Sequence, residues 1–402
     1  MSSPVDDGVR RIGENIRTAR RARGISLEAL AGLVGRSKSW LSKIENGRMR
    51  LDKRTDIAAL AEALEVSADY LLGQPAPEIR PNHPNHPNYN LARLQRVLMD
   101  AGPGDPPDVP ARSVEVLRTV LQEVDTALRR VEYGTMTRLL PDLIGELYVH
   151  TATSPEPARS KALKLLILAC GSGAAIMFRH LGEVNLAYIS GERAQQAAEL
   201  LGDPVWRGAA AFGRAHARGS ANKPRPLMIT PRIADEVEPH IGDDRFAHQV
   251  HGMLRLSAAL ARQIQGDHDG AADQAGEAAR LAEPLGDAPD AFEMFGVANV
   301  GVWRTSLAVE AGRPGEALKY ADKVDSRALS SHTRRAVLLM EKARAHAMLD
   351  RDADAVRELR KAERLSPIRV HNDPLIKELV ADMLGRSGGS DLRGLAWRMG
   401  LI

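Results

Sequence analysis

The sequence predicts an all-α protein: a small N-terminal domain of five helices, a proline-rich linker and a C-terminal α-solenoid. Aromatic residues make up only 4% of the 402 residues, and the abundance of Ala, Leu and Arg favours helices over strands. Residues 74–90 contain five prolines and no apolar periodicity, which is typical of a linker. From residue 111 onward, units of two helices joined by a tight turn recur, as in a helical-repeat protein.

Five short helices are expected between residues 9 and 73. Ser26 and Ser37 are suited to cap helix N-termini, and Gly24 and Gly35 to end the helices before them. The predicted helices span residues 12–23, 27–34, 38–45 and 55–64, and a last short helix is capped by Ser67.

Residues 74–110 form the predicted linker region, with one short helical piece at 91–100 and a second group of helix breakers at 101–110. His83 and His86 lie in the proline-rich part. Two histidines in such a segment lack the further ligands that a metal site needs. We therefore expect a linker here, and neither a metal nor a cofactor in the protein.

The predicted helical-repeat domain covers residues 111–402. Its clearest self-similarity is a long helix, a Gly/Asp turn and an Ala-rich helix, seen at residues 260–288, 307–324 and 345–367. The turns fall near Gly266, Gly312 and Asp350. Because each helix pair of a solenoid buries its face against its neighbours, we expect about six pairs between residues 114 and 365. A terminal helical cap should include residues 375–384.

The charge of the chain is concentrated near its N-terminus. Residues 10–54 hold thirteen Lys and Arg against four acids, a local balance of +9, which is typical of a protein that binds a polyanion. The single cysteine, Cys170, fits a reducing cytosol and is expected to be buried and inert. The longest apolar stretch, 165–178, has two glycines and is too short to span a bilayer. We therefore expect a soluble, cytoplasmic protein.

The second and third predicted helices form a helix-turn-helix pair. Lys38, Ser39, Ser42 and Lys43 share the outward face of the third helix, where they can reach base edges in a major groove. Trp40 can pack on the sugar-phosphate backbone or on the domain's own core. Residues placed to contact DNA phosphates are Arg17, Arg21, Arg23, Ser37, Trp40, Asn46, Arg48 and Arg50.

Residues 20–48 resemble the Cro-like, phage-repressor family of helix-turn-helix regulators, also called the xenobiotic-response-element family. The matching residues are Arg20, Gly24, Leu30, Ala31, Ser37, Leu41, Ser42, Ile44, Glu45 and Gly47. The resemblance implies a lambda-repressor-like DNA-binding domain over about sixty-five residues. It also implies an ion pair between Arg20 and Glu45 that ties the first helix to the third. Leu27 departs from the family, which often has Gln there as a DNA contact, so that contact is missing.

The C-terminal part resembles the degenerate tetratricopeptide-like domains fused to such modules in bacterial regulators, which implies a receptor or dimerisation domain. Three stripes of polar residues at helical spacing are candidates for a ligand groove. They are Arg207, Arg214 and Arg218; His248, His251, Arg255 and Arg262; and Asn299, Trp303 and Ser306. A cationic groove would suit a peptide carboxylate or another anionic ligand. The same stripes also fit solvated faces of amphipathic helices.

Common catalytic motifs are missing: the sequence has no P-loop, no G-x-G-x-x-G, no H-E-x-x-H and no G-x-S-x-G. We therefore expect a DNA-binding transcriptional regulator rather than an enzyme. Because one recognition helix reads few base pairs, a homodimer on a dyad-symmetric operator is expected, with a peptide or small-molecule effector. The alternative is a protein-interaction scaffold whose solenoid binds a partner protein.

Overall fold

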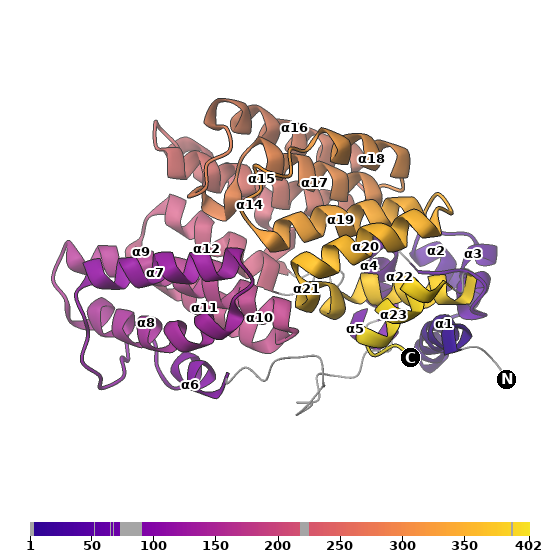
Figure 1. Ribbon diagram of the computed structural model, residues 1–402, viewed down its shortest axis with the longest axis horizontal. Coiled ribbons are helices and arrows are strands. Elements are labelled where there is room, and N and C mark those ends of the chain that lie inside the picture. Colours follow the sequence, from indigo (N-terminus) through magenta and orange to yellow (C-terminus); the bar gives the residue numbers. More distant parts are fainter. Residues whose placement is uncertain are drawn as a thin grey trace.

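The computed structural model describes residues 4–51, 53–64, 66, 68–72, 91–217, 225–386 and 389–402. Helices account for the regular structure of these residues, and the single β-bridge among them joins Gly102 to Asp105. The predicted all-α class is therefore confirmed. Figure 1 shows the N-terminal helices at one end of a larger array of stacked helices, beside its last helices.

The N-terminal domain has the five predicted helices. They are α1 (Pro4–Ala22), α2 (Leu27–Leu33), α3 (Lys38–Glu45), α4 (Arg54–Leu64) and α5 (Ala68–Leu71). The predicted caps of α2 and α3 are confirmed, because Ser26 Oγ accepts from the Ala29 amide at 3.0 Å and Ser37 Oγ from the Trp40 amide at 3.1 Å. The predicted cap Ser67 and the linker segment 74–90, with His83 and His86, lie outside the described residues.

The predicted helical piece at 91–100 is α6 (Ala92–Asp100). Leu94 and Leu98 on this helix are fully buried in the same hydrophobic core as α8 and α11. Arg193 on α11 donates from Nε to the Leu98 carbonyl at 2.9 Å. Residues 92–100 are therefore packed onto the first helices of the repeat array.

The array itself alternates long helices and tight turns. Its first half contains α7 (Val114–Arg129), α8 (Tyr133–Thr153), α9 (Ala158–Leu168), the π-helix η1 (Ala169–Ala174), α10 (Ala175–Leu181), α11 (Val184–Leu201), α12 (Pro204–Ala217), α13 (Arg225–Met228), α14 (Thr230–Val237) and η3 (Glu238–His240). Its second half contains α15 (Arg245–Ile264), α16 (His268–Leu285), η4 (Phe292–Met294), α17 (Val297–Glu310), α18 (Pro314–Lys323), α19 (His332–Ala347), α20 (Asp352–Leu365), α21 (Pro367–Asn372), α22 (Pro374–Arg386) and α23 (Ser390–Arg398).

The three predicted repeat turns are confirmed. Gly266, Gly312 and Asp350 lie between the helices of the pairs α15/α16, α17/α18 and α19/α20, and each adopts a positive φ, of 84°, 74° and 58°. The left-handed conformation lets the chain reverse within a few residues. The helices of each pair pack against one another, and α16 and α18 pack in turn against the following pair. The predicted helical cap is present as α22 and α23.

The longest apolar stretch of the sequence, residues 165–178, lies in α9, η1 and α10. Residues Ala158–Leu181 are long and apolar enough to cross a membrane by length and composition, but 67% of the relevant window is buried in the protein. Cys170, within this segment, is buried as predicted, and burial raises the pKa of its thiol to about 12. This helix is thus part of the core of the array.

Elements that are far apart in sequence meet at two places. Asn372 in α21 donates to the carbonyl of His180 in α10 at 2.9 Å, so the end of the array meets its first half. The N-terminal domain packs through α1 against α22, and Leu375 of α22 belongs to the domain's hydrophobic core. Arg50 donates to Asp382 Oδ2 at 2.8 Å across the same interface.

Candidate nucleic-acid interface

The core of the N-terminal domain holds α2 and α3 against α1. Leu30, Ala31, Leu41 and Ile44 are buried, together with Ile16 of α1. Val34 is partly buried at the edge of the same core. Burying such side chains supplies the main favourable free energy that fixes α3 in place.

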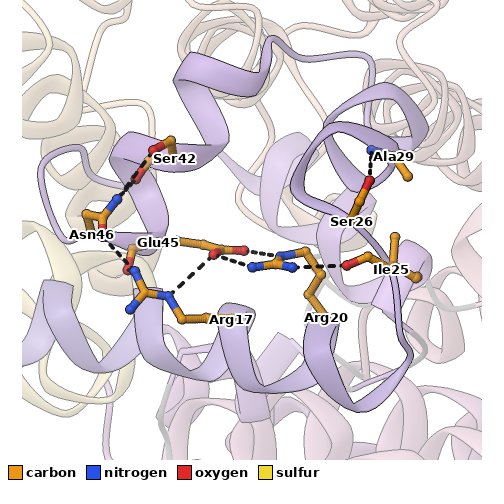
Figure 2. Close-up of polar contacts among 8 residues, drawn as sticks. All are labelled: Arg17, Arg20, Ile25, Ser26, Ala29, Ser42, Glu45 and Asn46. Carbon is orange, nitrogen blue, oxygen red and sulfur yellow. Dashed lines mark hydrogen bonds and ion pairs between the residues drawn. The ribbon is translucent and has the colours of Figure 1, made fainter.

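A network around Glu45 ties α3 to α1. The Glu45 side chain is only 3% exposed. Arg20 donates from Nε to Glu45 Oε1 at 2.6 Å and from Nη2 to Oε2 at 2.9 Å (Figure 2). The ion pair that the family resemblance implies is thus present in the structure. The hydrogen bonds to Glu45 raise the pKa of the Arg20 guanidinium.

The same network extends to both ends of the helix pair. Arg20 Nη1 donates to the Ile25 carbonyl at 3.0 Å, just before α2. Arg17 Nη2 donates to the Glu45 carbonyl at 3.0 Å and to Asn46 Oδ1 at 2.6 Å, just after α3 (Figure 2). Two arginines of α1 therefore fix the direction of α3, and Arg17, predicted to contact phosphate, has intramolecular partners here.

Gly13 allows the close crossing of α1 and α3. A Cβ at this position would lie 2.5 Å from the Ile44 carbonyl oxygen and 2.8 Å from that of Glu45. A larger side chain would push the two helices apart. The sequence analysis missed this residue, because a glycine within a helical pattern does not reveal what packs against it.

The predicted base-reading residues lie on the outer side of α3. Lys38, Ser39 and Lys43 are exposed and Ser42 is half-buried. Asn46 Nδ2 donates to the Ser42 carbonyl at 2.7 Å and to its Oγ at 3.3 Å. In Figure 1, α2 and α3 lie at the end of the molecule.

Among the other predicted DNA contacts, some side chains are exposed and others bind groups within the protein. Arg21, Arg23, Ser37 and Arg48 are exposed. Arg50, in contrast, is only 12% exposed and pairs with Asp382, so it faces the array rather than solvent.

Trp40 and Leu27 lie at the edge of the domain's core. Trp40 is half-buried, and the Arg36 guanidinium carbon lies 5.4 Å from the centre of its ring. Leu27, which stands where the family often has Gln, is also half-buried against the core. The Leu27 side chain thus contributes packing in place of a DNA contact.

The predicted ligand-groove residues are not brought together as one stripe. Arg255 donates to Asp235 and Glu238 at 2.8 Å each, and its Nε lies 3.2 Å from Nε2 of the buried His251. Burial lowers the pKa of His251 to about 4. Arg255 and His251 therefore take part in packing α14 against α15.

The remaining groove candidates divide in the same way. Arg207 is exposed, and Arg214 pairs with Glu192. Asn299 and Trp303 are buried on α17, where Asn299 bonds to Arg334. Arg218 lies outside the described residues. Asn299 and Trp303 lie one helical turn apart on α17.

The described part of the chain contains no group of three or more His, Cys, Asp or Glu side chains that could hold a metal ion.

Comparison with known proteins identifies the N-terminal domain. Residues 11–71 match the family model described as "Helix-turn-helix domain", and these residues span α1 from residue 11 onward and all of α2 to α5. Residues 11–71 are a helix-turn-helix domain. Comparison with curated proteins gives no match.

Three solved structures are similar over most of the chain. One is Bacillus thuringiensis PlcR in complex with the peptide PapR7 and DNA, at 12% identity and a TM-score of 0.40, over 91% of this chain and 99% of that one. The apo competence regulator ComR from Streptococcus vestibularis has 14% identity and a TM-score of 0.25, over 95% and 99%. Apo ComR from S. thermophilus has 14% identity and a TM-score of 0.21, over 94% and 100%.

Proposed function

We propose that this chain is a DNA-binding transcriptional regulator in which α3 of the helix-turn-helix domain is the recognition helix. The observation that carries the proposal is the arrangement of α3. Its inner face is fixed through Glu45 to Arg20 and Arg17, while Lys38 and Lys43 are exposed on its outer face. A rigid helix with an exposed cationic face is suited to the major groove.

The proposed contacts are of two kinds, to base edges in the groove and to phosphates. Lys38, Ser39, Ser42 and Lys43 would read base edges, with Lys donating to guanine O6 and N7. Side chains proposed to contact phosphates are Arg21, Arg23, Ser37, Asn46 and Arg48, which are exposed at the ends of the helices. Arg17, Trp40 and Asn46 have partners within the domain, which each would exchange for a phosphate on binding.

The helical-repeat domain, proposed at residues 111–402, would supply dimerisation and effector sensing. Because a single recognition helix reads only a few base pairs, we propose a homodimer on a dyad-symmetric operator. The effector would be a peptide or a small molecule, and the protein would act in the cytoplasm. This role uses no catalytic group and no cofactor, so we propose a regulator and not an enzyme.

The test is DNA binding by the full chain to the region upstream of its own gene, measured against random DNA. Lys38→Ala with Lys43→Ala should relax sequence preference, since each good base contact contributes about 1–3 kcal/mol of discrimination. Arg48→Ala should weaken binding to all sequences alike and reduce the salt dependence by about one charge.

The matched control is Lys161→Ala with Lys319→Ala, which removes the same charge from exposed sites on the array. This control should keep the preference for the operator. Equal affinity of the wild type for the upstream region and for random DNA at physiological salt would refute specific recognition.

A further inference from the structure

Five elements of the array bring a group of polar side chains together near its centre. We call Arg179, His216, Glu293, Trp303 and Arg334 the arginine cluster; they belong to α10, α12, η4, α17 and α19. Arg179 Nη1 donates to the His216 carbonyl at 3.2 Å, and the His216 ring meets the Trp303 ring edge-on at 5.6 Å. The Arg334 guanidinium carbon lies 5.2 Å from the centre of the Trp303 ring.

Arg334 is a half-buried cation whose hydrogen-bond acceptor is neutral. Its Nε donates to Asn299 Oδ1, a neutral acceptor. Among the described residues, no carboxylate forms an ion pair with its guanidinium. Glu341, which lies nearby, is bound by Arg344 at 2.8 Å and by Ser306 at 2.7 Å. Burial, and then the nearby charge of Arg179, lower the pKa of Arg334 to about 9.

Trp303 adds a second unsatisfied donor at the same place. Its side chain is only 9% exposed, and within the described part of the chain its Nε1–H has no acceptor. A buried N–H without a partner costs free energy, about 1–3 kcal/mol in mutational data. The Trp303 ring contacts both the His216 ring and the Arg334 guanidinium, so this donor belongs to the ring that Arg334 covers.

The backbone is irregular in both segments that border the cluster. Ser172 lies in the π-helix η1 and hydrogen-bonds the Glu293 carboxyl group. Glu293 and Met294 have φ values of 48° and 58°, an uncommon region for residues other than glycine. Asn299 Nδ2 holds this turn through the Glu293 carbonyl at 2.9 Å. Both π-helices and strained backbone are concentrated at functional sites.

We propose that the arginine cluster binds a carboxylate-bearing ligand, whose carboxylate accepts hydrogen bonds from the Arg334 guanidinium and from Trp303 Nε1. A carboxylate supplies two contacts that the cluster lacks, an ion pair for Arg334 and an acceptor for the indole. The planar guanidinium is suited to a carboxylate group, and Arg334, Arg179 and Glu293 are half-buried, so solvent reaches them.

This site would be the place where the helical-repeat domain binds its effector. The inference that ligand binding here regulates the protein rests on the proposed function. The sequence predicted a ligand groove that included Arg207, Arg214, His251, Arg255, Asn299 and Trp303. Arg214 and Arg255 are paired with acids, so the counter-charge is needed at Arg334 instead. The ligand carboxylate can come from a small organic acid or from the C-terminus of a short peptide.

The test is thermal unfolding of the full chain with sodium acetate, compared with sodium chloride at the same ionic strength. Because a ligand that binds only the folded state raises its melting temperature, acetate should stabilise the wild type more than chloride does. Arg334→Gln should weaken the apparent acetate affinity by about tenfold or more, since a charged hydrogen-bond partner is lost. Trp303→Phe keeps the ring but should also weaken acetate binding.

The matched control is Arg327→Gln, which removes an arginine whose side chain is 90% exposed and paired with Asp325. This variant should respond to acetate as the wild type does. An equal shift in acetate and chloride for the wild type, or an acetate response that survives in both Arg334→Gln and Trp303→Phe, would overturn the proposed site.

A second probe separates the two sources of the carboxylate. Tri-alanine with a free C-terminus and tri-alanine amide differ only in that group. Stabilisation by the free peptide at lower concentration than acetate, and its loss in the amide, would indicate a peptide. The same response to acetate and to the free peptide would indicate a small acid. Because these measurements contain no DNA, they can fail while the proposed DNA binding holds, and the reverse is also true.

Discussion

Arg20 of α1 binds the buried carboxylate of Glu45 at the end of α3 with two hydrogen bonds, of 2.6 and 2.9 Å. The Arg20 side chain is 13% exposed and that of Glu45 is 3% exposed. An ion pair this far from solvent contributes modestly as a pair, but removal of one partner leaves the other charge buried and uncompensated. The pair therefore makes the orientation of the recognition helix sensitive to either residue.

Glu45→Gln should destabilise the helix-turn-helix domain by about 3 kcal/mol, because Arg20 loses its counter-charge in a buried position. Hydrogen exchange of the α1 and α3 amides should become faster, with little change in α15 or α16. Glu28→Gln is the matched control: Glu28 pairs with Lys38, and both side chains are well exposed, at 77% and 61%. Similar exchange rates in the two variants would contradict this role of Glu45.

Gly13→Ala should weaken DNA binding by about tenfold or more, because a Cβ 2.5 Å from the Ile44 carbonyl oxygen forces α1 and α3 apart. Gly32→Ala in α2 makes the same chemical change where nothing lies within 4 Å of the added Cβ. Gly32→Ala should leave binding unchanged and raise the melting temperature of the domain slightly, since Ala favours helices over Gly. Binding titrations and thermal melts of both variants test this prediction. Equal losses of affinity in the two variants would contradict the role of Gly13 in the crossing of α1 and α3.

The sequence predicted the helix-turn-helix domain well because its determinants are local. Ser26 and Ser37 each cap an amide three residues further along the chain. These caps set the starts of α2 and α3 independently of the rest of the fold. The repeat turns at Gly266 and Gly312 are similarly local, because the left-handed conformation at each depends on the residue itself.

Of the two residues proposed to bind a carboxylate, helical spacing indicated Trp303 but not Arg334. Helical spacing correctly places His251 and Arg255 on one face of α15, but it does not say that α14 covers that face and supplies Asp235 to Arg255. Glu293 lies in the short, irregular η4, where no periodicity exists to place a side chain. Arg334 came from a helix that the polar stripes did not include. What pairs with a charge is decided by tertiary packing, which the sequence pattern does not contain.

Asp382→Ala should increase the salt dependence of DNA binding. Arg50 now donates to Asp382 at 2.8 Å, and its side chain is 12% exposed. Loss of that partner weakens the hold of the array on Arg50, and an additional phosphate contact by Arg50 should steepen the slope of log K against log salt by about 0.9. Asp391→Ala removes the same charge from an ion pair with Arg360, on helices α23 and α20. A slope that changes equally in both variants would point to net charge and not to Arg50.

Glu293 should make the folded state less stable as the pH rises towards neutral. Burial raises the pKa of its carboxyl group to about 7, in opposition to the hydrogen bond from Ser172 and the charges of Arg179 and Arg129, while Asp125 adds to the rise. Because the group binds its proton more tightly when folded, this contribution to stability is fully present below pH 4.5 and is lost as the pH passes through 7.

The Glu293→Gln variant isolates this effect, because Gln keeps the shape and does not titrate. The difference in melting temperature between variant and wild type should grow in favour of the variant from pH 5 to pH 8. Burial lowers the pKa of His251 to about 4, so His251 makes the folded state more stable as the pH rises from 4 to 6.5. This contribution is the same in both proteins and cancels in the difference. A difference that stays constant across this range would show that the Glu293 carboxyl group does not change its charge there.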